Sequence, residues 1–263
     1  MKFRTVLGTE LLKLRRSWIT RLSFLFYAFF GLIAWFMLWI ARNPGAAQGL
    51  GLIGQKANFA SAGLSADWTG LLFFLAEMNV AGAMIIFSFI VIWLFGREYV
   101  EGTAKNLLAL PVPRSRFVLA KLCVALGWCA LLTLFLALES LVVAAALGLG
   151  APPAGLFGRE IGNMFLAALL VFALEPITAW ITVASANYLA PFGYTMATLI
   201  VANLMAHTGW ARWCPWSAVA LLGGLAGPRD TAMTLSCGIV IAVAFAAGLA
   251  AALLHQSRAD NAQ

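Results

Sequence analysis

Long apolar runs alternate with short polar segments along almost the whole chain. Six runs of 18 to 27 residues contain either no charged residue or a single Glu. Since a membrane-spanning helix needs about 20 mostly apolar residues, the pattern predicts six transmembrane helices. The predicted spans are residues 22–41, 71–95, 122–148, 161–186, 189–206 and 231–254. The fourth and fifth are separated only by Asn187 and Tyr188.

Residues 1–21 follow a different pattern, because apolar residues recur there at steps of three and four. The repeating positions are Phe3, Val6, Leu7, Leu11, Leu14 and Trp18. Lys and Arg occupy much of the remaining surface. This pattern predicts an amphipathic interfacial helix that lies in the headgroup plane, with its charges toward anionic lipid. The alternative is a basic flank without regular structure.

The composition agrees with a membrane protein and excludes other classes. The chain is 63% hydrophobic and 10% charged, whereas a soluble domain is about 45–50% apolar and about 25% charged. The four cysteines lie far apart, without a CxxC pair or a nearby His. We therefore expect neither a metal site nor a disulfide framework, and the sequence offers no catalytic residue. The net charge of +7 is attributed to membrane topology and not to nucleic-acid binding.

The distribution of Lys and Arg predicts the orientation. Twelve basic residues would lie on one side of the membrane, namely Lys2, Arg4, Lys13, Arg15, Arg16, Arg21, Arg97, Lys105, Arg114, Arg116, Lys121 and Arg258. Five basic residues would lie on the opposite side, namely Arg42, Lys56, Arg159, Arg212 and Arg229. The basic side should be cytoplasmic, so both termini, including the tail 255–263, are expected inside. The longest segment between spans, 42–70, is too short for a domain of about 50 residues.

The segment after the second predicted span, residues 97–121, mixes both signs of charge. Glu98 and Glu101 are expected at the start of a short helix, where acidic residues are favourable. Pro111 and Pro113 should end that helix near Leu110. The segment therefore predicts a compact cytoplasmic helix that docks against another protein. The alternative is an ordinary basic connector between two spans.

This segment resembles a signature of ABC-2 type transporter permeases, in which Glu, Gly-Thr, Leu, Pro-Val and Lys recur in this order. The resemblance implies a six-span permease domain over residues 22–254, an elbow helix before it, and a location in the bacterial cytoplasmic membrane. It also implies that the cytoplasmic helix is a coupling helix touching an ATPase subunit. The implied coupling residues are Arg97, Glu98, Glu101, Gly102, Thr103, Lys105, Asn106 and Leu107. A weaker resemblance, at 212–216, is to bacitracin- and lantibiotic-resistance permeases.

The chain lacks the G-x-x-x-x-G-K-[ST] phosphate loop. If the family resemblance holds, ATP and Mg²⁺ belong to a separate ATPase chain, and this chain carries no cofactor of its own. The expected assembly has two ATPase copies and a second permease, which is either a copy of this chain or a homologue. The lipid bilayer is the remaining partner, and nucleic acid is not expected to be one.

Three acidic residues lie well inside apolar runs, which is costly unless they face protein or water. At about 1.5 Å per residue, Glu77 and Glu139 fall in the outer half of their spans and could share a vestibule. Glu175 lies deeper and precedes Pro176. Together with Asn79, these acids are candidate pathway residues for a cationic or amphipathic substrate. The alternatives are neutral acids, hydrogen bonds between helices, or a proton relay.

The segment between the last two predicted spans is rich in tryptophan. Trp210, Trp213 and Trp216 are spaced by three and are expected on one helix face at headgroup level. Residues 215–226 are apolar but too short to span a membrane. They predict a re-entrant helix before the last span, and the alternative is an aromatic anchor at the interface.

The sequence as a whole predicts an all-α integral membrane protein. The first functional hypothesis is the permease subunit of an ABC-2 exporter for a hydrophobic or amphipathic substrate, such as an antimicrobial peptide. A secondary transporter is the first alternative, although it should show an internal repeat and none is evident. A membrane scaffold that transports nothing is the second.

Overall fold

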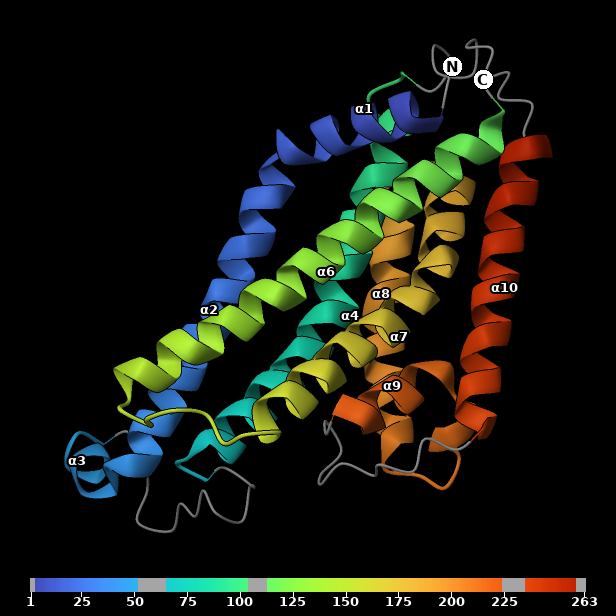
Figure 1. The fold of residues 1–263 in the computed structure, drawn as a ribbon. Helices are drawn as coiled ribbons and strands as arrows, with labels where there is room; N and C mark the ends of the chain where they lie inside the picture. Colours follow the sequence, from blue (N-terminus) through green and yellow to red (C-terminus); the bar gives the residue numbers. More distant parts are fainter. Residues whose placement is uncertain (1–2, 52–64, 104–112, 224–234, 259–263) are drawn as a thin grey trace.

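The computed structural model describes residues 3–51, 65–103, 113–223 and 235–258, and these ranges contain helices but no strands. The order of the elements is shown in Figure 1. They are α1 (Phe3–Arg15), α2 (Trp18–Arg42), α3 (Pro44–Gly49), α4 (Trp68–Val100), α6 (Arg114–Ala146), α7 (Leu156–Ser185), α8 (Leu189–Ala206), η1 (Ala211–Trp213), α9 (Pro215–Gly223) and α10 (Leu235–Arg258). The predicted all-α class is confirmed.

Six helices are long and apolar enough to cross a membrane, which confirms the predicted number. They are α2, α4, α6, α7, α8 and α10, and each overlaps one predicted range. Helices α4 and α6 are longest, at 33 residues each. They exceed the predicted spans because the charged residues flanking each apolar run continue the helix, whereas the hydropathy pattern marks only the apolar part.

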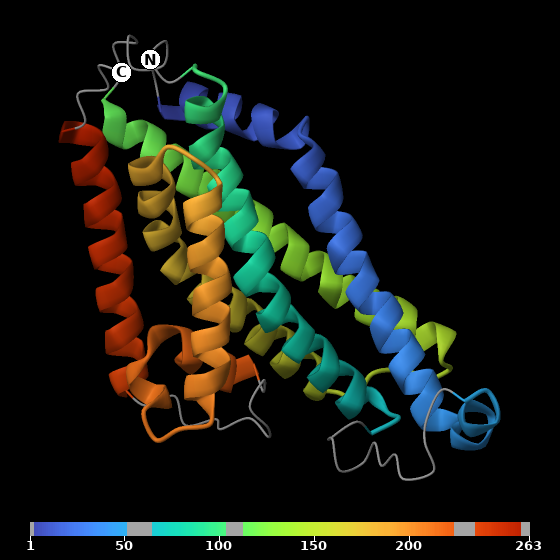
Figure 2. The ribbon, with the colours of Figure 1, turned by 180° about the vertical axis from the view of Figure 1, so that it is seen from behind.

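Helix α4 occupies the centre of the bundle. It is apolar on all sides, as expected for a helix buried all round, and it packs against α2, α6, α7, α8 and α9. Leu71, Leu75, Phe87 and Ile90 on α4 are fully buried. Seen from behind, α8, α4 and α2 cross one face of the molecule, with α6 and α7 behind them (Figure 2). A movement of α4 would therefore displace most of the bundle.

Glycines allow close approach at two helix crossings. Gly82 of α4 lies directly beneath the ring of Phe30 on α2, where a Cβ would collide with the ring. Gly248 of α10 lies against the backbone of Pro176 and Ile177 in α7. Small residues serve this purpose at helix contacts in membranes. The crossings fix α2 to α4 and α10 to α7.

The predicted helix over residues 1–21 is wrong in its extent. Helix α1 ends at Arg15, and Ser17 adopts an extended conformation before α2 begins at Trp18. The Ser17 hydroxyl donates to the Leu14 carbonyl at 2.7 Å, a local bond that competes with the continuing helix. The chain therefore turns at Ser17, and α1 lies across one end of the bundle (Figure 1). Its interfacial position stays a prediction.

Helices α3 and α9 lie at the end of the bundle opposite α1 (Figure 1). The expectation that three tryptophans share one helix face is wrong. Trp213 ends the short η1, Cys214 is extended, and Trp216 belongs to α9. The extended residue changes the direction of the chain, so Trp210 and Trp213 stay exposed while Trp216 packs edge-on against Tyr194. The re-entrant position of α9 stays a prediction.

Candidate functional site

Glu98, in the last turn of α4, is the centre of an ion-pair cluster. Its Oε2 lies 2.7 Å from Lys121 Nζ on α6, and its Oε1 lies 3.0 Å from Lys13 Nζ on α1. Lys13 also pairs with Glu10 at 2.6 Å. We call these four residues the Glu98 cluster. It connects three helices at the end of the bundle where α1 lies.

The Glu98 cluster is largely removed from solvent. Lys121 is 2% exposed and Glu98 is 8% exposed. Lys121 Nζ also donates to the Leu94 carbonyl at 2.6 Å, so its ammonium has two partners. A buried charge is costly unless it is paired and hydrogen-bonded, and the geometry meets this requirement. Two residues of the permease-like sequence pattern, Glu98 and Lys121, thus contact each other inside the protein.

Lys13 stays protonated at neutral pH in this setting. Burial alone would lower its pKa, but the hydrogen bond and charge of Glu10, together with Glu98, raise the pKa above its ordinary value. Sequence reasoning missed both Glu10 and Lys13. One signal was present, since Glu10 is spaced by four from Val6 and Leu14 on the buried face of α1. An acid on an apolar face needs a basic partner.

The end of α4 differs from the expectation for this segment. Glu98 and Glu101 do not begin a short helix, because α4 continues to Val100 and Glu101 caps its C-terminus. No residue before Gly102 breaks the helix. Gly102 has a φ of +68°, a conformation that glycine adopts without strain. The Thr103 amide then donates to the Glu98 carbonyl at 2.9 Å and the Gly102 amide to the Tyr99 carbonyl at 3.2 Å, which is a Schellman motif.

Some of the remaining coupling candidates lie on the surface of the protein, and the others lie outside the described residues. Arg97 pairs with Glu101 at 2.9 Å on the exposed side of α4 and lies over the Trp93 ring. Lys105, Asn106 and Leu107 lie outside the described residues, as does most of the predicted coupling helix. Its contact with an ATPase therefore stays a prediction. The described chain leads from the end of α4 at Val100 to Thr103, just before this segment.

Two of the candidate pathway residues join α4 to α7. Glu175 is 3% exposed and accepts a hydrogen bond from Ser88 of α4 at 2.8 Å. Asn79 is fully buried and donates to the Met164 carbonyl at 3.1 Å. This geometry matches one alternative, hydrogen bonding between neighbouring helices. A pathway role for either residue stays a prediction.

The other two acids lie elsewhere. Glu139 of α6 packs against α2, where a Cβ on Gly31 would lie 3.0 Å from the Glu139 Cδ. Glu77 is half-buried on α4 and has an interaction partner of its own. Both acids face protein at least in part, as expected for acids inside a membrane. A vestibule shared by Glu77 and Glu139 stays a prediction.

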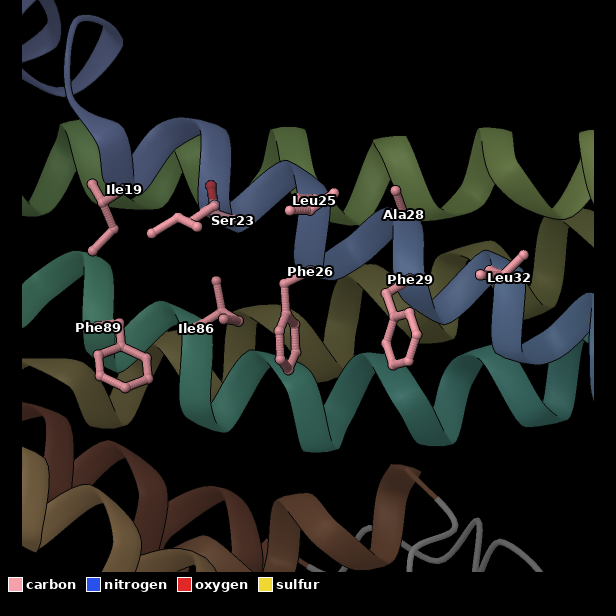
Figure 3. A pocket seen from close by; sticks show the side chains of 10 residues that line it. Ile19, Ser23, Leu25, Phe26, Ala28, Phe29, Leu32, Ile86 and Phe89 are labelled. Carbon is pink, nitrogen blue, oxygen red and sulfur yellow. The ribbon is translucent and has the colours of Figure 1, made fainter.

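An apolar groove of about 700 Å³ opens between α2 and α4. Figure 3 shows the rings of Phe26 and Phe29 extending from α2 toward α4, with Ile86 and Phe89 on the opposite wall. We call it the α2–α4 groove; its lining residues are Ile19, Leu22, Ser23, Leu25, Phe26, Ala28, Phe29, Leu32, Ile86 and Phe89. The groove could not be predicted from the sequence, because its lining residues have the pattern of ordinary lipid-facing positions.

A family profile described as ABC-2 family transporter protein matches residues 6–202 of this chain. The chain belongs to the ABC-2 family of transporter proteins. The matched range runs from within α1 to within α8, and it includes the Glu98 cluster and the α2–α4 groove. With its six apolar helices, this ABC-2 protein is a multi-pass membrane protein.

This ABC-2 protein is also similar to a curated relative, the bacitracin transport permease protein BCRB of Bacillus licheniformis. The two are 31% identical over 139 residues, which is 51% of this chain and 64% of the relative. The match therefore covers just under two thirds of the relative's length. No solved structure matches the chain. Over the described part of this ABC-2 protein, no group of three His, Cys, Asp or Glu side chains could hold a metal ion.

Proposed function

We propose that this ABC-2 protein is the permease subunit of an exporter driven by ATP hydrolysis on separate chains. The observation that carries the proposal is the continuity of α4. It runs without a break from Trp68 to Val100, contacts five other helices, and is joined to α1 and α6 by Glu98. A force on the segment after Gly102 would reach the middle of the bundle through one rigid helix.

The proposal includes the partners of this chain. Two ATPase subunits would bind at the end of the bundle where α4 stops, and they would hold the ATP and Mg²⁺. A second permease, identical or homologous, would complete the pathway. Helix α1 and the end of α10 lie at the same end of the bundle (Figure 1), as an even number of spans requires. The proposed location is the bacterial cytoplasmic membrane, with both termini inside.

The proposed substrate is hydrophobic or amphipathic, and an antimicrobial peptide fits this class. The name of the relative supports the proposal, since that protein is a bacitracin transport permease. One feature of this chain agrees with it, since Glu77 and Glu139 could attract a cationic peptide without demanding a fixed shape.

Purification from the native membrane without crosslinker tests the proposal. We expect a soluble partner that carries the phosphate-loop motif to co-purify, and we expect the complex to hydrolyse ATP. Reconstituted vesicles should then move a cationic amphipathic peptide in an ATP-dependent manner. Isolation of the chain without any ATPase, together with peptide movement that follows an ion gradient, would favour a secondary transporter instead.

A further inference from the structure

A polar cleft continues the α2–α4 groove at the end of the bundle where α1 lies. The cleft has a volume of about 590 Å³, and its lining residues are Thr9, Leu12, Lys13, Arg16, Ser17, Trp18, Trp93, Arg97 and Glu101. Trp93 also lines an intermediate apolar space of about 390 Å³. That space in turn shares Ile19 and Phe89 with the α2–α4 groove. Cleft, intermediate space and groove therefore form one continuous surface.

The two ends of this surface differ in chemistry. The cleft contains three basic side chains and one acid, whereas the groove is lined by apolar residues and Ser23. Lys13 belongs to the Glu98 cluster and Arg97 pairs with Glu101. Within the described ranges, Arg16 has no acidic partner. The cleft thus presents an uncompensated positive charge beside an apolar surface.

The length of the surface matches one leaflet of a membrane. Arg97 and Ile86 are eleven residues apart on α4, which corresponds to about 16 Å at 1.5 Å per residue. Half of the hydrocarbon core of a bilayer is about 15 Å thick. When the basic cleft lies at headgroup level, the groove reaches close to the middle of the bilayer. Trp18 and Trp93, which both line the cleft, are of the residue type that favours the interface.

We propose that this surface binds one anionic phospholipid from the leaflet on the α1 side. Its phosphate would lie at Arg16 and Arg97, where guanidinium groups suit phosphate geometry, and its acyl chains would lie along Phe26 and Phe29. Charge argues against a second copy of the chain as the occupant. A two-fold contact centred on the groove would bring two copies of the same basic cleft into one interface.

Native mass spectrometry of the full chain purified in detergent tests this site. Phosphatidylglycerol and phosphatidylethanolamine with identical acyl chains are the probes, and we expect phosphatidylglycerol to be retained preferentially. Arg16→Gln should lower that retention roughly fivefold, which corresponds to about 1 kcal/mol for one basic residue near a membrane surface. Retention of phosphatidylethanolamine should change much less. Arg15→Gln is the matched control, because it removes the same charge from an exposed position of α1 outside the cleft.

A second variant tests the apolar part of the site. Ala28 lines the groove, so Ala28→Trp should fill it and lower the retention of both lipids. Ala246→Trp, on an exposed position of α10, introduces the same side chain elsewhere and should retain lipid like the wild type. The proposal is overturned if Arg16→Gln equals Arg15→Gln, or if the wild type does not prefer phosphatidylglycerol. The proposal is also overturned if the Ala28→Trp variant retains lipid like the wild type. This holds equally if the Ala28→Trp substitution converts a dimer of the chain into a monomer while lipid is retained.

Discussion

Lys121 of α6 lies 2.7 Å from Glu98 of α4, and its side chain is almost wholly buried. The two residues lie on either side of the segment that contains most of the permease-like pattern. Their pairing means that the two sides of this segment are fixed to each other before any partner binds. The pair therefore defines the base from which the proposed coupling segment extends.

Replacing Lys121 with Met should destabilise the protein strongly, because it leaves Glu98 with only Lys13 as a counter-charge. Breaking a buried ion pair from one side costs about 3–5 kcal/mol. The double variant Glu98→Gln with Lys121→Met should recover part of this loss. Thermal unfolding in detergent measures both. Arg97→Gln is the control, since it breaks the exposed pair with Glu101 and should cost about 1 kcal/mol or less. Equal losses for Lys121→Met and Arg97→Gln would contradict the structural role of the pair.

Gly102→Ala should lower stability by about 1 kcal/mol, because the positive φ at this position is strained for any residue with a Cβ. In the complex with its ATPase, it should also reduce substrate-stimulated ATP hydrolysis, as should Glu101→Lys. Gly127→Ala on α6 is the control. Gly127 is helical with open space around it, so this change should stabilise the helix slightly. A wild-type ATPase response in both Gly102→Ala and Glu101→Lys would mean that the segment does not transmit the signal.

Ala186→Gly should raise stability by up to about 1 kcal/mol, the opposite sign to the change at Gly102. Ala186 is the non-glycine residue with positive φ among the described residues, at +50° in the turn between α7 and α8, and glycine adopts this conformation without strain. Ala184→Gly, two residues earlier and inside α7, should instead lower stability by about 1 kcal/mol. The same thermal assay measures both variants, and a loss of stability at both positions would refute the argument.

Glu77→Gln and Glu139→Gln should each lower protection against a cationic peptide while leaving folding and basal ATP hydrolysis intact. Two unit charges 4 Å apart in water interact with about 1 kcal/mol. The inhibitory concentration of the cationic peptide should therefore fall roughly fivefold in each variant. A neutral substrate supplies the comparison and should be affected much less. If protection against both substrates falls equally, the acids act as structural hydrogen-bonding groups, and no change for either would remove them from the pathway.

The proposed orientation can be checked by labelling single cysteines on intact cells with an impermeant thiol reagent. The four native cysteines are first replaced. A cysteine at Asn58 should react, because the segment 42–70 is expected outside, whereas a cysteine at Ser257 should react only after the membrane is opened. The reverse pattern would invert the topology and move the end of α4 away from the cytoplasm.

The hydropathy of the sequence was enough to predict the class and the number of spans, because six long apolar runs with at most one charge each leave few alternatives. The ends of the helices were harder to predict. Val100 and Arg15 end their helices through a glycine conformation and a serine hydroxyl, and both effects depend on local geometry that hydropathy does not record. The expected tryptophan face failed for the same reason, since a single extended residue at Cys214 redirects the chain.

The candidate site was predictable only in part. Glu98 and Lys121 stood out in the sequence, but their contact did not, because it requires the packing of α4 on α6. Lys13 is 85 residues from Glu98 in the chain, a separation at which no periodicity signals a contact. The α2–α4 groove depends on how two helices diverge. Hydropathy alone therefore treats its residues like any others that face lipid.

Helix α1 is far along the chain from the helices that it contacts, and this separation determines when it can dock during biosynthesis. Val6, Glu10 and Leu14 are synthesised before α2, but the helices that pack on this side of α1 include α4 and α6. Until Glu98 and then Lys121 are synthesised, this face of α1 lacks the charged residues that complete the Glu98 cluster. The first segment to be synthesised therefore reaches its final position only after α4 and the start of α6 have been made.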